Sequence, residues 1–355
     1  MIRQTYQIDI ITPCFCGGAE PEKHAEIRAP SIRGQLRWWF RVLGGFKSLA
    51  HLPLPKQESL IFGLTAGDEE TAGKLAVRVH PRGLKSTRKD GQELGHANFT
   101  DSAFLTFPVQ SREKQGIKTD YAGRGVIEGA FELTLLWRGE PSFAADLQAL
   151  AVVFGNLGSL GFRARRAMGA LAFQQQPPLK FSDAIVRFNT SHALDIRSLP
   201  SVSAKGAISS LGGWLKSCRA HGRSGQNRDE QDGAYFAYAK NDHDIGYDMS
   251  DTANAPAFRP ALGLPIIQRT QRATNNWEWA WNVQKRKNEG RFASPVILRP
   301  HRAADGSWHA LVIFVDAKKW DVSKKVYLNG TPRDVSLDLY EAMKSDPRLK
   351  PFPPA

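Results

Sequence analysis

The chain has 355 residues, of which 41% are hydrophobic and 23% are charged. This is an ordinary globular composition that excludes wholesale disorder, and the length suits two domains of about 100–200 residues each. There is no run of about 18 apolar residues that would span a membrane. The N-terminus lacks a signal-peptide pattern, and three cysteines cannot build a disulfide framework. We therefore expect a cytoplasmic protein with no membrane partner.

The net charge is the most informative feature of the composition. The chain holds 48 Lys+Arg against 35 Asp+Glu, a surplus of 13 positive charges. A surplus of this size favours a polyanionic partner, and nucleic acid is the commonest polyanion in a cell. A merely basic enzyme is the alternative that composition leaves open. The surplus is concentrated in three stretches with few acids or none, residues 27–49, 155–173 and 258–302.

The first predicted element is a strand around residues 6–10. Tyr6, Ile8 and Ile10 alternate there with polar residues, which is the period-2 pattern of a strand with one buried face. A loop with Gly17 and Gly18 follows, and the missing side chains would let a ligand approach its backbone closely.

The next predicted element is a helix over residues 31–43. Ser31 is its expected N-cap, and Gly44-Gly45 closes it. Five apolar side chains at helical spacing form one stripe that we expect to be buried. The stripe consists of Ile32, Leu36, Trp39, Phe40 and Leu43.

The rest of the first half continues an α+β pattern. Strands are expected over residues 74–80, 104–109, 131–137 and 170–173, a helix over 142–154, and a linker over 174–178. Strand, helix, two or more strands, helix and strand is the split βαβ order of ferredoxin-like and RNA-recognition folds. The polar segment 83–125 is long enough to be an inserted hairpin or a mobile loop.

The second half is less regular but contains similar elements. We expect helices over residues 204–221 and 334–343, a polar loop over 222–233, and strands over 295–299 and 308–315 joined by a hairpin turn at 303–306. The predicted fold class is α+β, with tandem ferredoxin-like (RRM-like) domains and long inserted loops. The predicted domains are residues 1–178 and 179–355, the second also ferredoxin-like.

Arginines line the first helix beside and opposite its apolar stripe. Arg33, Arg37 and Arg41 form a ridge, and Trp38 and Gly34 lie on the same side. A charged ridge with a flat ring and a glycine suits a nucleic-acid backbone and its bases. The alternative is that the ridge packs on acidic residues and that Trp38 fills a seam between domains.

A glycine-rich loop precedes the second cluster of arginines. Glycines recur at every third position from Gly155 to Gly161, ahead of Arg163, Arg165 and Arg166. A dinucleotide fingerprint needs a strand before it and a helix after it, whereas here the order is reversed. Such a loop can instead hold phosphates without reading sequence. A helix C-cap followed by a basic turn is the alternative.

The third basic stretch combines arginines with tryptophans. Trp277, Trp279 and Trp281 lie on one side of an extended strand, between Arg269 and Arg291. They suit stacking on bases, but a buried sheet face or a subunit interface explains them equally well.

Candidates for catalysis are few. Cys14 and Cys16 resemble half of a metal site, yet there is no second pair. His24 could act as a general base for RNA cleavage, but no tyrosine or lysine partner is identifiable. The acidic group around residues 242–248 reads as a solvated loop. We expect no catalytic residue, no metal and no cofactor.

One long string of residues carries a family resemblance. Residues 17–19, Gly-Gly-Ala, followed by Glu-Ile-Arg-Ala-Pro-Ser-Ile-Arg-Gly-Gln-Leu-Arg-Trp-Trp-Phe-Arg at 26–41, closely resemble the N-terminal signature of the first subunit of the type III-B CRISPR effector, the Cmr complex, within the RAMP superfamily. Residues 61–63, 162–171, 260–266 and 293–295 look like later pieces of the same family. One departure is Ala167-Met168-Gly169, where such loops more often read Arg-Gly-Phe/Tyr-Gly.

The resemblance implies tandem ferredoxin-like domains in a non-catalytic subunit that binds guide and target RNA near the 3′ end of the guide. It also implies a neighbouring RAMP subunit and backbone subunits, to which target cleavage is assigned. An endoribonuclease that processes repeat RNA with His24 as base is the alternative, and a basic protein that uses its tryptophans only for protein contacts is a third hypothesis. The expected RNA-binding residues are Gly17, Gly18, Arg28, Ser31, Arg33, Gly34, Arg37, Trp38, Arg41, Gly158, Gly161, Arg163, Arg165, Arg166, Arg269 and Arg291.

Overall fold

The computed structural model describes residues 1–17, 26–64, 72–87, 105, 112–114, 117–119, 126–190, 193–219, 238, 241–242, 245, 255–271, 276–285 and 290–352. The chain divides into two compact units. Unit 1 comprises Met1–Gly212, Leu298–Ile313 and Pro351–Ala355, and unit 2 comprises Gly213–Ile297 and Phe314–Lys350. The predicted domain boundary after residue 178 separates the two ferredoxin-like sheets described below, which is a different division from these two units. That boundary stays a prediction.

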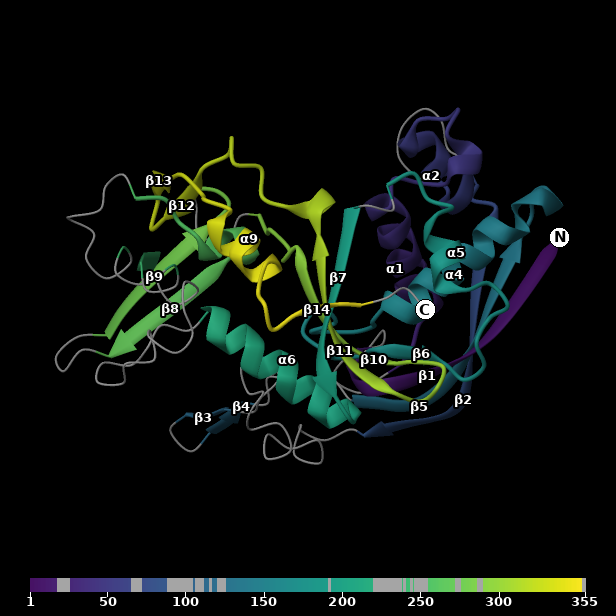
Figure 1. Cartoon of the computed structure of the whole chain (residues 1–355), viewed down its shortest axis with the longest axis horizontal. Coiled ribbons are helices and arrows are strands. Elements are labelled where there is room, and N and C mark those ends of the chain that lie inside the picture. The colour runs from purple at the N-terminus through teal and green to yellow at the C-terminus, as the bar shows by residue number, and fades with distance from the viewer. Residues whose placement is uncertain are drawn as a thin grey trace. The chain divides into compact units, whose positions relative to one another are not determined.

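The N-terminal sheet of unit 1 has the ferredoxin-like topology. Its strands are β1 (Ile2–Phe15), β2 (Leu75–Thr87), β5 (Val126–Trp137) and β6 (Leu171–Phe173), in the antiparallel order β2-β5-β1-β6. The helix α1 (Ala29–Val42) follows the first of these strands, and α4 (Ala144–Leu157) follows the third. Both helices pack on one face of the sheet (Figure 1). This is the split βαβ arrangement that the order of elements predicts.

Strand β1 is longer than the alternating pattern alone indicates. Tyr6, Ile8 and Ile10 are buried as expected, and Ile8 pairs with Phe131 of β5. The register between β1 and β5 then shifts between Ile10 and Cys14. Such a bulge increases the local twist and redirects the end of the strand.

Helix α1 has the buried stripe predicted for it but a different start. Pro30 lies in its first turn, and the N-cap is Arg28, whose carbonyl accepts the first main-chain bonds. The expectation of Ser31 as N-cap was wrong, because the fixed φ of proline suits the first turn and moves the helix start forward. At the other end, Gly44 and Gly45 have positive φ and close the helix in a Schellman motif, as predicted.

The second four-stranded sheet repeats the connectivity of the first. Its order is β10-β11-β7-β14. Along the chain, strand β7 (Leu194–Ser201) is followed by helix α6 (Ala204–Arg219), strands β10 (Val296–Arg302) and β11 (Trp308–Val315), helix α9 (Asp338–Lys344) and strand β14 (Lys350–Pro351). The prediction of an α+β fold with tandem ferredoxin-like domains is thus confirmed.

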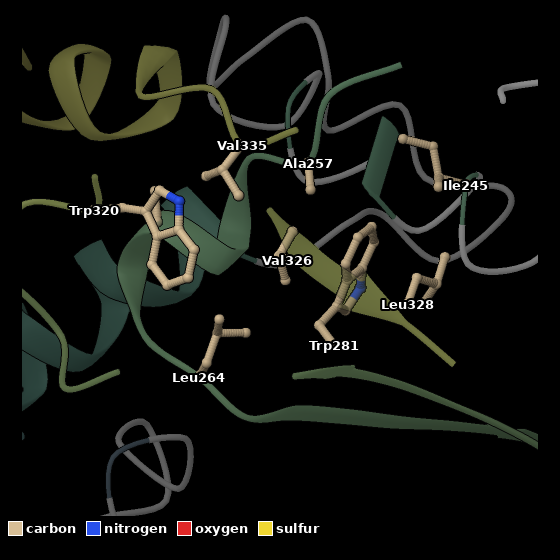
Figure 2. Close-up of a cluster of buried hydrophobic side chains, with 9 residues drawn as sticks. Ile245, Ala257, Leu264, Trp281, Trp320, Val326, Leu328 and Val335 are labelled. Atoms are coloured by element: carbon tan, nitrogen blue, oxygen red, sulfur yellow. The ribbon is translucent and has the colours of Figure 1, made fainter. Parts of the chain in front are cut away.

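A further sheet that was not predicted is built from two inserted segments, one between α6 and β10 and one between β11 and α9. It contains β8 (Ile266–Gln271), β9 (Asn276–Asn282), β12 (Val326–Leu328) and β13 (Thr331–Arg333), in the order β13-β12-β9-β8. Its core in unit 2 includes Trp281, which packs with Val326 and Leu328 (Figure 2). Trp281 is therefore a core residue. For this tryptophan, the alternative of a buried sheet face is correct. The side chains of Trp277 and Trp279 lie outside the described residues.

The remaining elements are short. They are α2 (Leu54–Phe62), α5 (Phe181–Ile185), the hairpin of β3 (Arg112–Lys114) and β4 (Ile117–Thr119), and the 3₁₀ turns Lys47–Leu49, Pro141–Phe143, Arg259–Leu262 and Asp316–Lys318. The inserted segment 83–125 thus holds a hairpin. Within the described residues, no helix combines the length and the apolar character needed to cross a bilayer.

Several predicted boundaries need correction. Of the strand expected over 104–109, only Leu105 is described, and it is helical rather than extended. The last helix starts at Asp338 instead of residue 334, because Val335 pairs with Ala257 in a short bridge. Helix α6 is described only to Arg219, and the loop 222–233 lies outside the described residues.

Candidate nucleic-acid interface

Trp38 of α1 joins the first basic stretch to the second. The guanidinium carbon of Arg165 lies 4.7 Å from the centroid of the Trp38 ring, which is cation–π distance. The other neighbour of Trp38 is Trp39, whose ring meets it edge-on at 4.8 Å. Trp38 is therefore explained by a contact within unit 1, and this contact places the loop arginines beside the helix ridge.

The glycine-rich loop is also fastened to the end of β1. The amide of Phe162 donates to the carbonyl of Phe15 at 2.8 Å, and the amide of Gly169 donates to the carbonyl of Pro13 at 2.8 Å. Gly161 has φ +81, and a Cβ on it would lie 2.6 Å from the Phe15 carbonyl oxygen. These bonds hold the backbone of the loop against the end of β1, just before Gly17 in the chain.

Close packing within the chain accounts for the other glycines of this loop. A Cβ on Gly155 would lie 2.2 Å from the ring of Phe173, and one on Gly158 would lie 2.3 Å from the Phe154 carbonyl. The Gly158 amide donates to that same carbonyl at 2.7 Å. At these two positions the structure matches the C-cap alternative rather than a phosphate cradle. Gly155 is thus explained by packing of α4 on β6, and Gly158 by the last turn of α4 itself.

The helix ridge faces an acidic residue of α2. Arg37 and Arg41 both bind the carboxylate of Glu58, with Arg41 Nη2 at 2.5 Å from Oε1. The Glu58 side chain is only 9% exposed, whereas those of Arg37 and Arg41 are 35% and 49% exposed. The alternative that the ridge pairs with acid is thus correct for these two arginines. Each still exposes part of its side chain to solvent.

The charges of this cluster reinforce one another. Burial acts to raise the pKa of Glu58, but hydrogen bonds and positive charge from Arg41 and Arg37 outweigh it and lower the pKa. The hydrogen bond to Glu58 in turn raises the pKa of Arg41. One carboxylate shared by two guanidinium groups leaves the cluster with a net positive charge.

Arg33 holds the end of α2. Its Nη2 donates to the carbonyl of Phe62, the last residue of α2, and its Nε is buried without a hydrogen-bond partner among the described residues. A cation at a helix C-terminus interacts favourably with the helix dipole. Arg33 is therefore partly structural, in contrast to the open ridge that helical periodicity predicts.

Gly34 and its neighbours form the open part of the helix surface. A Cβ on Gly34 would meet nothing within 4 Å, and the residue is exposed. Ser31 is exposed in the first turn. Arg28 pairs with Glu26 at 3.3 Å with both side chains nearly half exposed. No contact within the described chain requires a glycine at position 34.

The three loop arginines are partly buried. Arg163 donates from Nε to the carbonyl of Leu105 at 2.6 Å, and burial lowers its pKa to about 10. Burial also lowers the pKa of Arg165, which lies over Trp38. Arg166 donates to the Arg165 carbonyl at 3.3 Å. The loop therefore brings desolvated positive charge close to α1.

Sequence reasoning missed Arg299, which lies beneath this loop. It is completely buried on β10, and its guanidinium donates to the carbonyls of Gly155, Gly158 and Leu171. It also binds the Pro300 carbonyl and His301 Nδ1. Burial lowers the pKa of Arg299 to about 9. The available signal was a charge within the apolar run at 296–300, but its partners lie far away in the chain.

The same strand also binds the loop through its backbone. The amide of Leu298 donates to the carbonyl of Arg165 at 3.2 Å, and the amide of Ala167 donates to the carbonyl of Leu298 at 2.9 Å. Ala167 is buried with φ +69, a conformation that favours glycine. The loops that this sequence resembles more often have glycine at this position, so the departure noted in the sequence falls on a residue with a left-handed backbone.

The remaining predicted residues are not brought to this cluster by the described structure. Gly18 and His24 lie outside the described residues, as does the side chain of Arg269 on β8. Arg291 is exposed in unit 2. Within the described ranges, no three His, Cys, Asp or Glu side chains gather as metal ligands. We call the cluster in unit 1 the ridge–loop surface, defined by Ser31, Gly34, Arg37, Trp38, Arg41 and Arg165.

Comparison with known proteins gives a consistent family. Residues 7–172 match the RAMP superfamily. The chain is 28% identical to the CRISPR system Cmr subunit Cmr1-2 of Pyrococcus furiosus over 182 residues, which are 49% of this chain and 96% of that protein. It is 30% identical to Cmr1-1 of the same organism over 180 residues, 48% of this chain and only 47% of that relative's length.

The fold has a solved counterpart. The crystal structure of apo Cmr1 from Pyrococcus furiosus superposes with a TM-score of 0.54 at 17% identity, covering 97% of this chain and 96% of that one. This likeness concerns the fold alone. The matched segment 7–172 contains the first ferredoxin-like sheet, α1 and the glycine–arginine loop. This part of the chain therefore matches the RAMP superfamily, and its sequence is similar to Cmr subunits.

Proposed function

We propose that the chain is a non-catalytic RNA-binding subunit of a type III-B CRISPR effector complex. In this proposal it lies near the 3′ end of the guide RNA, beside other Cmr subunits, and helps to capture target RNA. The relatives named Cmr1-1 and Cmr1-2 support membership of such a complex. The observation that carries RNA binding is the Arg165–Trp38 contact, because it joins two basic stretches into one surface.

The ridge–loop surface suits the RNA backbone better than it suits individual bases. The side chains of Arg37 and Arg41 are partly exposed, and Gly34 leaves free space between them and the helix start. Arg165 already lies over the Trp38 ring, so Trp38 positions a charge as well as offering an aromatic surface. Backbone contacts of this kind position RNA without reading its sequence. We therefore expect sequence-tolerant binding.

Glu58 limits how strongly this surface can bind. A phosphate that approaches Arg37 and Arg41 must compete with a carboxylate that already accepts their hydrogen bonds. Arginine binds carboxylate and phosphate with the same bidentate geometry, so the exchange gains less than binding to an unpaired arginine would. Moderate affinity for RNA alone, strengthened within an assembled complex, is the expected behaviour.

Salt dependence of RNA binding tests the proposal. We would measure the affinity of the full chain for a short single-stranded RNA over a salt series, and compare Arg41→Gln with Lys324→Gln. Each variant removes one positive charge, so the two change the net charge equally. Lys324 is 70% exposed and lies in unit 2, outside the ridge–loop surface. Loss of a phosphate contact at Arg41 should weaken binding and make the salt slope less negative by about 0.7. Equal behaviour of the two variants would remove the ridge–loop surface from the proposal.

The place along the guide needs an assembled complex. A photo-reactive nucleotide near the 3′ end of the guide should crosslink to this chain, and one near the 5′ end should not. Peptide mapping of the crosslink should find residues of the ridge–loop surface. Crosslinks from the 5′ end alone would contradict the proposed position.

Incubation with repeat-containing RNA and a chelator tests the non-catalytic part. Intact RNA supports a binding subunit. Specific cuts that disappear in His24→Ala would overturn it in favour of the endoribonuclease alternative.

A further inference from the structure

Two cysteine sulfurs lie next to each other below the glycine-rich loop. Cys14 Sγ and Cys16 Sγ are 3.0 Å apart, at the end of β1 and just after it. The amide of Cys16 donates to the carbonyl of Cys14 at 3.1 Å, which is a three-residue turn. In a straight strand, residues two apart lie farther from each other than in such a turn. The turn therefore brings the two residues toward the spacing that a disulfide requires.

The two thiols differ in their surroundings. Cys14 has no exposed surface, whereas Cys16 is 8% exposed. The hydrogen bond from Cys14 lowers the pKa of Cys16, and burial opposes this effect. The hydrogen bond with Cys16 and burial both raise the pKa of Cys14. A more exposed thiol with more thiolate character next to a protonated one is the arrangement of a nucleophilic and a resolving cysteine.

We propose that Cys14 and Cys16 are a redox-active dithiol that hydrogen peroxide oxidises to an intrachain disulfide. The Cys16 thiolate attacks one peroxide oxygen, so that an S–O bond forms, the O–O bond breaks and hydroxide leaves. The Cys14 sulfur then attacks the sulfenic sulfur, the S–S bond forms and the S–O bond breaks. The Cys14 proton leaves with that oxygen as water, so hydrogen peroxide accepts two electrons from the two sulfurs.

The dithiol touches the loop that the proposed function uses. Cys14 Sγ lies 3.5 Å from the carbonyl of Leu160, and Cys16 Sγ lies 3.0 Å from where a Cβ on Gly161 would be. Drawing the two sulfurs into a bond changes the packing under Leu160 and Gly161. Oxidation should therefore alter RNA affinity through the loop. This coupling, unlike the dithiol itself, rests on the proposed function.

Oxidation of the full chain tests the dithiol without RNA. The reduced protein would be treated with stoichiometric hydrogen peroxide, denatured in an alkylating reagent and digested for mass spectrometry. We expect the peptide with Cys14 and Cys16 to lose two hydrogen atoms, to escape alkylation and to recover with dithiothreitol. Cys218 is the matched control, since its side chain is as completely buried as that of Cys14. Alkylation of all three cysteines after treatment, or oxidation of Cys218 at the same rate, would overturn the proposal.

Single variants separate the roles of the two sulfurs. In Cys14→Ser the sulfenic acid of Cys16 has no resolving thiol, so a dimedone adduct should accumulate at Cys16. In Cys16→Ser no adduct should form on Cys14. An adduct on Cys14 instead would contradict the assignment of Cys16 as the nucleophile.

The coupling to RNA has a separate readout. The affinity of the wild-type chain for single-stranded RNA should change several-fold on oxidation, and that of the Cys14→Ser/Cys16→Ser double variant should not. A disulfide that forms with no change in affinity would overturn the coupling and leave the dithiol standing. Absence of RNA binding in the reduced protein would count against the proposed function and not against the dithiol.

Discussion

At the scale of single residues, packing within the described chain does not explain why residue 34 is a glycine. Glycine within a helix is less stable than alanine by about 0.5–1 kcal/mol, and glycine is favoured where φ is positive or where a neighbour fills the Cβ position. Neither holds at Gly34, which lies in α1 with nothing within 4 Å of the Cβ site. In the proposed function, RNA that comes close to the helix surface would account for this glycine.

Substitution of Gly34 separates stability from binding. Gly34→Ala should raise the free energy of unfolding by about 0.5–1 kcal/mol and weaken RNA binding. Gly213 of α6 is the matched control, since it is a helical glycine with an equally open Cβ position. Gly213→Ala should stabilise the chain and leave RNA affinity unchanged. Urea unfolding and RNA titration measure both effects, and unchanged affinity in Gly34→Ala would show that RNA does not approach this helix face.

Glu58 is the residue that restrains the ridge. Glu58→Gln should strengthen RNA binding, because it frees Arg37 and Arg41 from a competing carboxylate. Glu128→Gln, at an exposed position on β5, controls for the change in net charge. RNA titration at fixed salt measures the difference. An equal gain in both variants would indicate a general charge effect, and weaker binding in Glu58→Gln would mean that Glu58 only positions the arginines.

The lowered pKa of Glu58 gives the same variant a second signature. A carboxyl whose pKa is lower in the folded than in the unfolded chain stabilises the fold above the ordinary glutamate pKa of about 4.3. That contribution is lost as the pH falls through the folded pKa. Glu58→Gln should therefore be less stable than wild type at neutral pH, and the difference should narrow below about pH 4.

At the scale of elements, the glycine–arginine loop depends on strand β10. The strand supplies both main-chain bonds to the loop and the Arg299 guanidinium beneath it. The two carbonyls of Gly155 and Gly158 belong to the C-terminal end of α4, where a positive charge is favourable. Elements from the two ferredoxin-like repeats thus shape one loop within unit 1.

Replacement of Arg299 tests this dependence. Arg299→Met should destabilise the chain by about 3 kcal/mol or more, because buried carbonyls lose their donors. Arg299→Lys should lie in between, since lysine keeps the charge but lacks the planar fork. Arg302, on the same strand, pairs with Asp9 at 2.5 Å and is 31% exposed, so Arg302→Met should cost about 1 kcal/mol or less. Thermal or urea unfolding of the three variants gives the order, and near-wild-type stability of Arg299→Met would contradict it.

At the scale of the whole molecule, buried His301 links stability to pH. Burial lowers its pKa to about 3, and the neighbouring charge of Arg299 adds to this. The unfolded chain takes up a proton near pH 6.5, whereas the folded chain resists it. Above about pH 6.5, His301 is neutral in both states and does not change the free energy of unfolding. As the pH falls from there toward 3, this residue lowers the free energy of unfolding by about 1.4 kcal/mol per pH unit.

The acid sensitivity of the chain should follow this residue. Protonation of His301 in the unfolded chain should lower the free energy of unfolding by about 2 kcal/mol between pH 7 and pH 5. In His301→Asn this loss of about 2 kcal/mol should be absent. His309 on the adjacent strand β11 is the control, and His309→Asn should keep most of the decline. The measurement is the change in unfolding free energy between the two pH values, not its absolute size. An equal decline in wild type and His301→Asn would contradict the prediction.

Local patterns determined the elements of this protein. The alternation of Tyr6, Ile8 and Ile10 and the stripe from Ile32 to Leu43 are properties of short segments, so β1 and α1 could be found from sequence. The order of such elements gave the ferredoxin-like topology, because few ways exist to connect and cover a sheet of that order. The first and last residues of the elements were less certain. At α1, Ser31 was predicted as N-cap, but the first turn, which contains Pro30, starts after Arg28.

The tertiary structure alone decided how the candidate site is built. Glu58 meets Arg37 and Arg41, Arg165 meets Trp38, and Arg299 supports Gly158 from 141 positions away in the chain. No periodic pattern links such residues, since their contacts arise only when separate elements pack together. Helical periodicity placed the arginines on one face correctly, but it could not show which of them the fold itself would bind. The sequence alone determined where the positive charge lies along the chain, and packing determined how much of that charge remains open to solvent.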